Sequence, residues 1–383
     1  MCWVLGAGVL APSTKHSALS TTQSADTIRA VTDEIFMRRA LELAERGRYG
    51  VSPNPMVGCV IVRDGAIIGE GWHRRAGEAH AEVEALRKCD PRDATMYVTL
   101  EPCCHTGRTP PCTNAIREAG IARVVLAMRD PNELVNGRGI EQLQGIEITT
   151  GVLEHEARRL NEKFVWAKSQ KLPFVLLKAG MTLDGKLATV TRESQWITSS
   201  EARERSLMLR EEYDAVATGS GTLIADNPRL SRRLGVSESI TPFTRVVLDA
   251  GGEAPPHAQL FADGGRTILF TPRAPQDLAS SVEVVEMPTI DGRLDLVVVL
   301  RELHERGIQS LLVEGGSLVH SDFISRGLWQ KMIVFVAPAI VGGAEAPSIF
   351  AGRPVSRLTD AYRFRFDRVE VVGSDLMITA YSH

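Results

Sequence analysis

Two apolar runs near residue 60 predict the first strands of a folded domain. Met56–Arg63 and Ala66–Trp72 are separated only by Asp64-Gly65, and an Asp-Gly connection between apolar runs is typical of a β-hairpin. The next segment, Glu78–Lys88, places Ala and Leu on one side at helical spacing, which predicts a short helix that opens near His80. We expect a hairpin followed by a helix.

The pattern continues through a strand and two helices to about residue 170. Thr95–Leu100 is a short apolar run that predicts a strand. Pro110-Pro111 predict the start of a helix over Cys112–Ala119, which ends at a glycine. A further helix is expected over Leu153–Lys168, and the polar turn 170–173 after it contains a proline. We expect the boundary between two domains at this turn.

Apolar runs and helical patterns alternate beyond the turn, which predicts an α/β domain on a largely parallel sheet. One turn within it, Glu314-Gly315-Gly316-Ser317, joins a buried strand to a helix, and its glycines would let backbone N–H groups approach a phosphate. A tight strand–helix turn with no ligand would use the same residues. The expected strands are Phe174–Ala179, Tyr213–Thr218, Arg245–Asp249, Thr267–Thr271 and Ser310–Val313, and the expected helices are Ser200–Glu212, Leu294–Arg306 and Leu318–Arg326.

Length and composition favour a two-domain enzyme. At 383 residues the chain exceeds the usual size of one core, and we expect domains at 31–170 and 171–383. The net charge of −3, from 44 basic and 47 acidic residues, gives no basic field for nucleic acid. No apolar run approaches the length of a membrane span. Six cysteines in a chain of this length indicate no disulfide framework, so a cytoplasmic location is expected.

Residues 1–30 are expected to be a disordered extension. Gly6–Ala11 matches the dinucleotide-binding pattern G-x-G-x-x-A, but Pro12 and a Ser/Thr-rich tract replace the helix that this fingerprint requires. The segment lacks the basic start of a secretory signal, whereas an organellar leader remains an alternative. Met37 is expected to open the first helix.

The chemistry is carried by His80-Ala81-Glu82, Glu101-Pro102-Cys103 and Cys112. A His-x-Glu pair followed by Pro-Cys and a second Cys is the signature of zinc deaminases, in which the Glu is an acid/base and not a ligand. Three protein ligands, His80, Cys103 and Cys112, leave the fourth position of a tetrahedral zinc for water. Zinc lowers the pKa of such a water toward neutrality, and Glu82 is the expected proton shuttle.

The ligand set and the class of the metal site remain open at this point. The two cysteines are separated by eight residues instead of the two of the general signature. Cys104 could replace Cys103 as a ligand, and His105 could supply a fourth ligand to a closed structural site. A non-catalytic zinc scaffold and a nucleic-acid-editing deaminase are the rival classes, and the second predicts a basic, aromatic-rich channel that the 5% aromatic content does not support.

The wider sequence resembles the bifunctional riboflavin-biosynthesis deaminase/reductase family. The resemblance rests on Asn54–Val60, on the His-Ala-Glu triplet at 80–82, and on Leu100–Cys112, whose long spacer is typical of that family. It implies a cytidine-deaminase-like N-terminal domain with one zinc per chain, held by His80, Cys103 and Cys112. It also implies deamination of a phosphoribosylated diaminopyrimidinone with Glu82 as catalytic residue. Asn54 would bind the pyrimidine, and the spacer 105–109 would reach the ribose phosphate.

The second half resembles the reductase domain of the same family, which is similar in fold to dihydrofolate reductase and uses NADPH. The segments that carry this resemblance are Lys178–Gly185, Ser194–Thr198, Thr222–Pro228 and Val313–Gly316. The implied reaction is hydride transfer that reduces the ribosyl group to ribityl, with Lys178 polarising the sugar. The implied cofactor residues are Gly180, Trp196, Thr222, Asp226, Gly316, Ser317, Leu318, Val319, His320, Ser321 and Asp322. The implied substrate residues, besides Asn54, are Lys178, Ser194, Arg210, Leu230, Arg233 and Glu314.

Plainer roles for the reductase residues remain open. Trp196 could belong to the core, Asp226 could be a turn residue and Arg210 could lie on a solvated helix face. The rival enzyme is a deaminase alone with a non-reducing C-terminal domain. The resemblance also implies a homo-oligomer that acts on small molecules.

Overall fold

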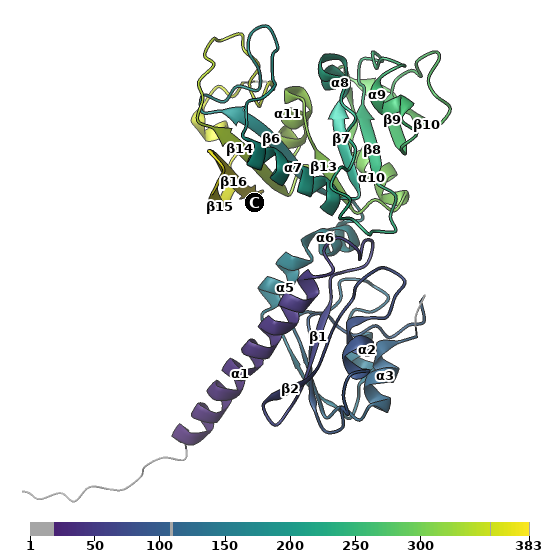
Figure 1. Ribbon diagram of the computed structural model, residues 1–383, viewed down its shortest axis with the longest axis vertical. Coiled ribbons are helices and arrows are strands. Elements are labelled where there is room, and N and C mark those ends of the chain that lie inside the picture. The colour runs from purple at the N-terminus through teal and green to yellow at the C-terminus, as the bar shows by residue number, and fades with distance from the viewer. Residues whose placement is uncertain (1–18, 108–109, 353, 383) are drawn as a thin grey trace, which may run out of the picture.

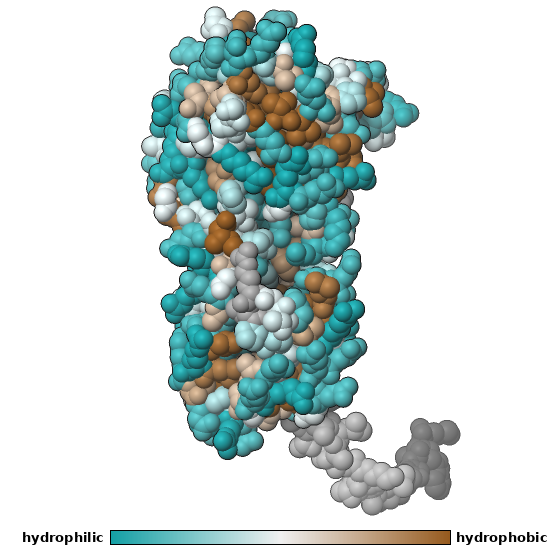
Figure 2. All heavy atoms as spheres, turned by 90° about the vertical axis from the view of Figure 1, so that its right-hand side faces the viewer, coloured by the Kyte–Doolittle hydropathy of each residue, from teal (hydrophilic) through white to brown (hydrophobic). Residues whose placement is uncertain are grey.

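The computed structural model describes residues 19–107, 110–352 and 354–382, which build two large sheets with separate hydrophobic cores and one two-stranded sheet. In Figure 1 the first sheet and its helices form the lower part of the molecule and the second sheet forms the upper part. The face in Figure 2 is mostly hydrophilic, with its largest hydrophobic area in the upper part. None of the helices in the described residues combines the length and apolar character needed to cross a membrane.

The first sheet has five strands in the order β2-β1-β3-β4-β5. The predicted hairpin is confirmed, with Asp64 and Gly65 at φ 52° and 75° in its turn, as a type I′ turn requires. The remaining strands run parallel to β3. The strands are β1 Gly58–Arg63, β2 Ala66–Trp72, β3 Thr95–Val98, β4 Arg123–Leu126 and β5 Glu147–Thr150.

The first helix begins earlier than predicted. Helix α1 runs over Leu19–Glu45, so the expected disorder of residues 19–30 and the helix start at Met37 are wrong. Neither glycine nor proline occurs between Pro12 and Gly47, so nothing in the backbone chemistry stops the helix from extending toward the N-terminus. Residues 1–18, including the dinucleotide-like stretch, lie outside the described residues.

Helices cover both faces of the first sheet. In Figure 1, α1 and α5 lie on one side, and α2 and α3 lie on the other. Helix α1 packs so closely that a Cβ on Gly58 would lie 1.9 Å from the carbonyl oxygen of Ala40. The helices after α1 are α2 Ala81–Leu86, α3 Cys112–Glu118, α4 Arg138–Gln142, α5 Glu154–Leu160 and α6 Glu162–Gln170.

The single helix expected over Leu153–Lys168 is two helices that break at Asn161. The Asn161 side chain accepts from Met56 N–H at 2.8 Å and donates to Met56 C=O at 2.9 Å. A buried amide satisfied in this way by a distant segment fixes the chain at the break. This contact joins α6 to the segment that precedes β1.

The second sheet has nine strands in the order β10-β9-β8-β7-β13-β6-β14-β16-β15. It is parallel from β10 to β14, as expected, and its last two strands run antiparallel. The pattern predicted neither these two strands nor β10 and β14. The strands are β6 Phe174–Thr182, β7 Ala215–Gly219, β8 Thr244–Leu248, β9 Thr267–Thr271, β10 Val282–Glu286, β13 Ser310–Val313, β14 Lys331–Ala337, β15 Arg365–Val372 and β16 Asp375–Tyr381.

Helices and a small hairpin complete the second half. Predicted helices at 200–212, 294–306 and 318–326 are confirmed with small shifts of their ends. The elements are α7 Ser200–Glu212, α8 Ser220–Asp226, α9 Gln259–Ala262, α10 Leu296–Glu305, α11 Ser317–Ser325, the 3-10 helix Leu358–Asp360, and the hairpin β11 Thr289–Ile290 with β12 Arg293–Leu294.

Polar contacts join the two halves. Ser52 donates to Asp214 at 2.5 Å, and the backbone N–H of Glu238 donates to the carbonyl oxygen of Tyr49 at 2.7 Å. Such a junction resembles the polar interfaces usual between domains of one chain. The domain limits 31–170 and 171–383 stay a prediction.

Candidate active sites

One imidazole and two thiols meet at one end of the first sheet. His80 caps the N-terminus of α2, Cys112 begins α3, and Cys103 follows the end of β3. Their donor atoms all lie within 4.8 Å of one another. His80 Nδ1 lies 3.3 Å from Cys112 Sγ and 3.5 Å from Cys103 Sγ. The structure therefore brings together the three residues that the spacing predicts as metal ligands.

The donor set fits zinc. One imidazole and two thiols are ligands that zinc prefers, and three of them leave a tetrahedral position open. The hydrogen bond with the Cys112 side chain, followed by that with His80, outweighs burial and lowers the pKa of Cys103 to about 4. Cys104 instead directs its Sγ to the carbonyl oxygen of Leu134 at 3.6 Å. Within the described residues, neither Cys104 nor His105 joins the donor group.

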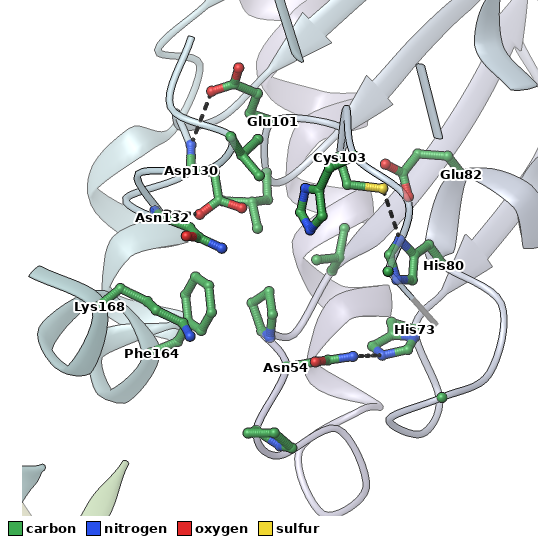
Figure 3. Close-up of a pocket in the computed structure, with 18 of the residues that line it drawn as sticks. Asn54, His73, His80, Glu82, Glu101, Cys103, Asp130, Asn132, Phe164 and Lys168 are labelled. Atoms are coloured by element: carbon green, nitrogen blue, oxygen red, sulfur yellow. Dashed lines mark hydrogen bonds between the residues drawn. The ribbon is translucent and has the colours of Figure 1, made fainter. Parts of the chain in front are cut away.

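Glu82 faces the same cavity from the first turn of α2. Its side chain is buried, and burial raises its pKa. Figure 3 shows Glu82 beside His80 and Cys103, on one side of the pocket. A buried carboxyl next to a metal-type donor set, and outside that set, is suited to move a proton.

Glu101 fixes the loop opposite the donors, which the sequence analysis missed. Its two carboxylate oxygens accept the backbone N–H groups of Asp130, Gly137 and Ile140 at 3.1–3.2 Å. A Cβ on Gly139 would lie 2.3 Å from the carbonyl oxygen of Pro102. The Pro102–Cys103 segment is thus held against the 130–140 loop.

Asn54 lies in the cavity with a defined orientation (Figure 3). His73 Nδ1 lies 3.1 Å from the carbonyl oxygen of Ala79, so Nδ1 carries the proton and Nε2 is an acceptor. Asn54 Nδ2 lies 3.0 Å from that Nε2 and therefore donates to it. Burial lowers the pKa of His73, which keeps the ring neutral. The Asn54 carbonyl oxygen remains as an acceptor for a substrate N–H.

The cavity has a volume of about 370 Å³ and reaches the junction between the halves. Its sequence-predicted members are Asn54, His80, Glu82, Cys103 and, from the spacer 105–109, His105 and Gly107. Residues 108–109 of that spacer lie outside the described residues. The lining residues that pattern reasoning missed come from loops and from α6, and only Asp130-Pro131-Asn132, a turn after an apolar run, gave a local signal. These missed residues include His73, Asp130, Asn132, Phe164, Lys168 and Gln309.

A second site lies in the upper half, where two cavities share Thr222 and Asp226. The larger cluster of predicted cofactor residues, Gly316–Val319 and Asp322, lines a cavity of about 810 Å³ at the N-terminus of α11. A Cβ on Gly316 would lie 3.0 Å from Thr222 Oγ1, and one on Gly219 would lie 2.8 Å from Val319. Glycines therefore leave the backbone without side chains where the N-terminus of α11 faces the cavity. Exposed backbone N–H groups at a helix N-terminus are suited to bind the phosphates of a dinucleotide.

The adjoining cavity contains a buried charge cluster. Arg210 Nε and Nη2 meet the two oxygens of Glu314 at 2.5 and 2.9 Å, and Lys178 Nζ lies 3.5 Å from Glu314. Arg210 Nη1 donates to the carbonyl oxygen of Ser231 at 3.2 Å. Arg210 is therefore committed to protein acceptors, whereas the exposed Arg233 has no ion pair within the described residues.

The structure separates some predicted residues from the cavities expected for them. Gly180 and Trp196, expected to bind the cofactor, line the cavity that contains Glu314. Ser194, expected to bind the substrate, lines the cavity at α11. Trp196 is 70% exposed, with the Arg203 guanidinium 4.6 Å from its ring centroid, so it is not a core residue. His320 and Ser321 turn away: His320 is buried beneath β13, and Ser321 Oγ donates to Ser317 C=O at 2.8 Å. Leu230 is buried at the edge of the Glu314 cavity.

Family models match both halves of the chain. Residues 30–128 match the cytidine and deoxycytidylate deaminase zinc-binding region, and residues 173–378 match the RibD C-terminal domain. The fold expected from the resemblance is confirmed in both halves.

Curated relatives and solved structures match along nearly the whole chain. The riboflavin biosynthesis protein RibD of Escherichia coli is 40% identical over 361 residues, which cover 90% of this chain and 98% of that protein. RibD of Aquifex aeolicus is 41% identical over 351 residues, 90% of this chain and 97% of the relative. A structure of Acinetobacter baumannii RibD has a TM-score of 0.85 at 37% identity, covering 92% of this chain and 99% of that one. A diaminohydroxyphosphoribosylaminopyrimidine deaminase/5-amino-6-(5-phosphoribosylamino)uracil reductase from Thermotoga maritima has a TM-score of 0.83 at 38% identity, covering 93% and 100%.

Proposed function

The chain belongs to the RibD family of riboflavin-biosynthesis proteins, and we propose that its two cavities are the deaminase and reductase sites of that family. The protein is a bifunctional enzyme, a zinc-dependent deaminase and an NADPH-dependent reductase. The observation that carries the assignment of the first site is the His80–Cys103–Cys112 triad beside the buried Glu82.

The proposed substrates are those named for the Thermotoga maritima relative. The deaminase would act on 2,5-diamino-6-(5-phosphoribosylamino)pyrimidin-4-one, and the reductase would convert the ribosyl group of the product to ribityl. A deaminase with a non-reducing second half is not favoured, because the RibD C-terminal domain spans 173–378 and the charge cluster around Glu314 is complete.

In the deaminase site, zinc held by His80, Cys103 and Cys112 would supply a Lewis acid that activates water. Glu82 is placed to take a proton from that water and to pass a proton to the amine that leaves the pyrimidine ring. The oriented Asn54 carbonyl accepts a ring-edge N–H and holds the pyrimidine against the triad. The loop fixed by Glu101 closes the other wall.

In the reductase site, NADPH supplies the hydride. Gly316 and the first backbone N–H groups of α11 would hold its pyrophosphate. Lys178 is proposed to donate a hydrogen bond to the sugar oxygen near the hydride-accepting carbon, while Glu314 and Arg210 position its ammonium. Arg233 is proposed to meet the ribose phosphate, because Arg210 is already engaged.

The decisive experiment separates the two reactions in time. Purified protein incubated with the diaminopyrimidinone phosphate should release ammonia without NADPH, and NADPH should then be oxidised only by the deaminated product. Ammonia release that strictly required NADPH would contradict two independent sites.

We also propose a homo-oligomer, in which the outer edge of β15 contacts a second copy. Strand β15 ends the nine-stranded sheet, and no strand of the described residues pairs with its outer side. Val369 and Val371 are 58% and 75% exposed on it. The strand also carries Arg365, Asp367, Arg368 and Glu370, but an unpaired edge strand with exposed apolar side chains is often covered in a native protein.

A cytoplasmic location is proposed as well. Every cysteine within the described residues is a free thiol, and the triad needs two of them reduced. Cell fractionation with an antibody against the chain tests this location.

A further inference from the structure

Lys168 occupies the end of the deaminase cavity that is farthest from the chemistry. It extends from α6 and lines the same cavity as His80 and Glu82. In Figure 3, Lys168 and Phe164 lie on the opposite side of the pocket from His80 and Glu82. Among the described lining residues, Lys168 is the one lysine or arginine.

The ammonium of Lys168 is not committed to a protein partner. No ion pair or hydrogen bond of its side chain occurs within the described part of the chain, and its Nζ lies 5.7 Å from the ring centroid of Phe164. Lys171, three residues further on, instead pairs with Glu133 at 3.4 Å. Lys168 is half-buried, so its charge is only partly screened by solvent.

Asp130 is the acidic group that shares this part of the cavity. Burial raises the pKa of Asp130 to about 6, and the charge of Lys168 acts against that rise. The two groups do not form an ion pair. Lys168 therefore remains open to an anion that enters the cavity.

The substrate class supplies such an anion. If the pyrimidine lies against Glu82 and the triad, the phosphoribosyl arm must extend away from them along the cavity. A phosphate monoester carries about −1.5 to −2 charges at pH 7, and lysine is a common point-charge ligand for phosphate. We propose that Lys168 binds the phosphate of the phosphoribosyl substrate together with the spacer 105–109, whose His105 and Gly107 line the same cavity, and that it adds to the preference of the deaminase for the phosphorylated form. This role rests on the proposed deaminase function.

The test compares three variants, Lys168→Gln, Lys168→Arg and Lys171→Gln, on two substrates. Lys168→Gln and Lys171→Gln remove the same charge from the same helix end, but only Lys168 lines the cavity. Ammonia release is measured with the phosphoribosyl diaminopyrimidinone and with its dephosphorylated ribosyl form. Lys168→Gln should raise KM for the phosphorylated substrate about 10- to 100-fold, the usual range for a lost charge-assisted hydrogen bond.

The other kinetic constants and the control variants also have expected values. With Lys168→Gln, kcat should change less than about threefold and KM for the dephosphorylated form should not move. Lys168→Arg should restore most of the affinity, and Lys171→Gln should match the unsubstituted protein. Zinc content and thermal melting of each variant establish that its fold is intact.

Three outcomes would overturn the proposal. An unchanged KM in Lys168→Gln would exclude contact with the phosphate, and an equal rise for both substrates would place Lys168 at the ring or the ribose. If the unsubstituted protein did not prefer the phosphorylated substrate, no phosphate site would exist in this cavity. These outcomes differ from failure of the deaminase assignment itself, in which the unsubstituted protein releases no ammonia from either substrate.

Discussion

Arg210 and Glu314 are 104 residues apart in the sequence and form a two-bond ion pair, with Nε–Oε1 and Nη2–Oε2 distances of 2.5 and 2.9 Å. Burial raises the pKa of Glu314, but the charges of Lys178 and Arg210 outweigh burial and hold the pKa at about 2. The carboxylate of Glu314 is therefore ionised at neutral pH, where it pairs with Lys178 and Arg210.

Glu314→Gln should destabilise the protein in a pH-dependent way. At pH 7 it leaves two buried cations without their counter-charge, which costs on the order of 3–5 kcal/mol. The pKa of Glu314 is lowered from 4.5 to about 2 on folding, so its contribution is complete above about pH 4.5 and is lost as the pH falls toward 2. Urea unfolding should show a larger gap between the two proteins at pH 7 than at pH 3. The exposed Glu305→Gln is the control, and a gap that did not shrink in acid would contradict the assignment.

Glu82→Gln should abolish ammonia release without removing zinc. The amide keeps the shape of the side chain but cannot accept a proton, and loss of an acid/base group costs about 100- to 10,000-fold in kcat. Glu84→Gln is a matched control, because Glu84 lies on the same short helix and pairs outward with Arg74 and Arg87. Metal analysis and steady-state ammonia assays measure both effects. A Glu82→Gln protein that had lost its zinc would make Glu82 a ligand.

The sequence predicted the donors of the metal site but not the walls of the cavity. His80, Cys103 and Cys112 could be found because each sits at a strand end or helix start with its own local signal. Lys168 had no such signal, since it lies on α6, the start of which is tied through Asn161 to Met56, 105 residues away. That contact is a product of tertiary packing.

The sequence predicted part of the fold, namely the regular strands and helices, but not every strand of the second sheet. Parallel strands bounded by helices were recovered in the second half, where apolar runs alternate with amphipathic helices. Strand β14, Lys331–Ala337, was missed because a short apolar run does not by itself distinguish a strand from a buried helix. Strand β15 was missed because it is exposed on both faces and lacks a buried alternation.

Cys112→Ser should remove zinc and deamination while leaving reduction intact. The triad loses one of three donors, whereas the second sheet has its own core and its own cavities. The variant should oxidise NADPH normally when given the deaminated intermediate. Cys89→Ser, outside the triad and partly exposed, is the control for loss of a thiol. Parallel loss of both activities would show that the metal site supports the fold of the whole chain.

Replacing the two exposed valines of β15 by lysine should shift the oligomer toward monomer. Val369→Lys with Val371→Lys places two charges on the strand that ends the sheet, and charged side chains on an edge strand oppose pairing with another chain. Because these residues lie on the outermost strand and outside both candidate sites, deamination should persist per chain. Leu358→Lys, at a position 84% exposed in the 3-10 helix before β15, is the matched control for added charge. Light scattering after size exclusion measures the mass, and an unchanged oligomer in the double variant would exclude this edge as the interface.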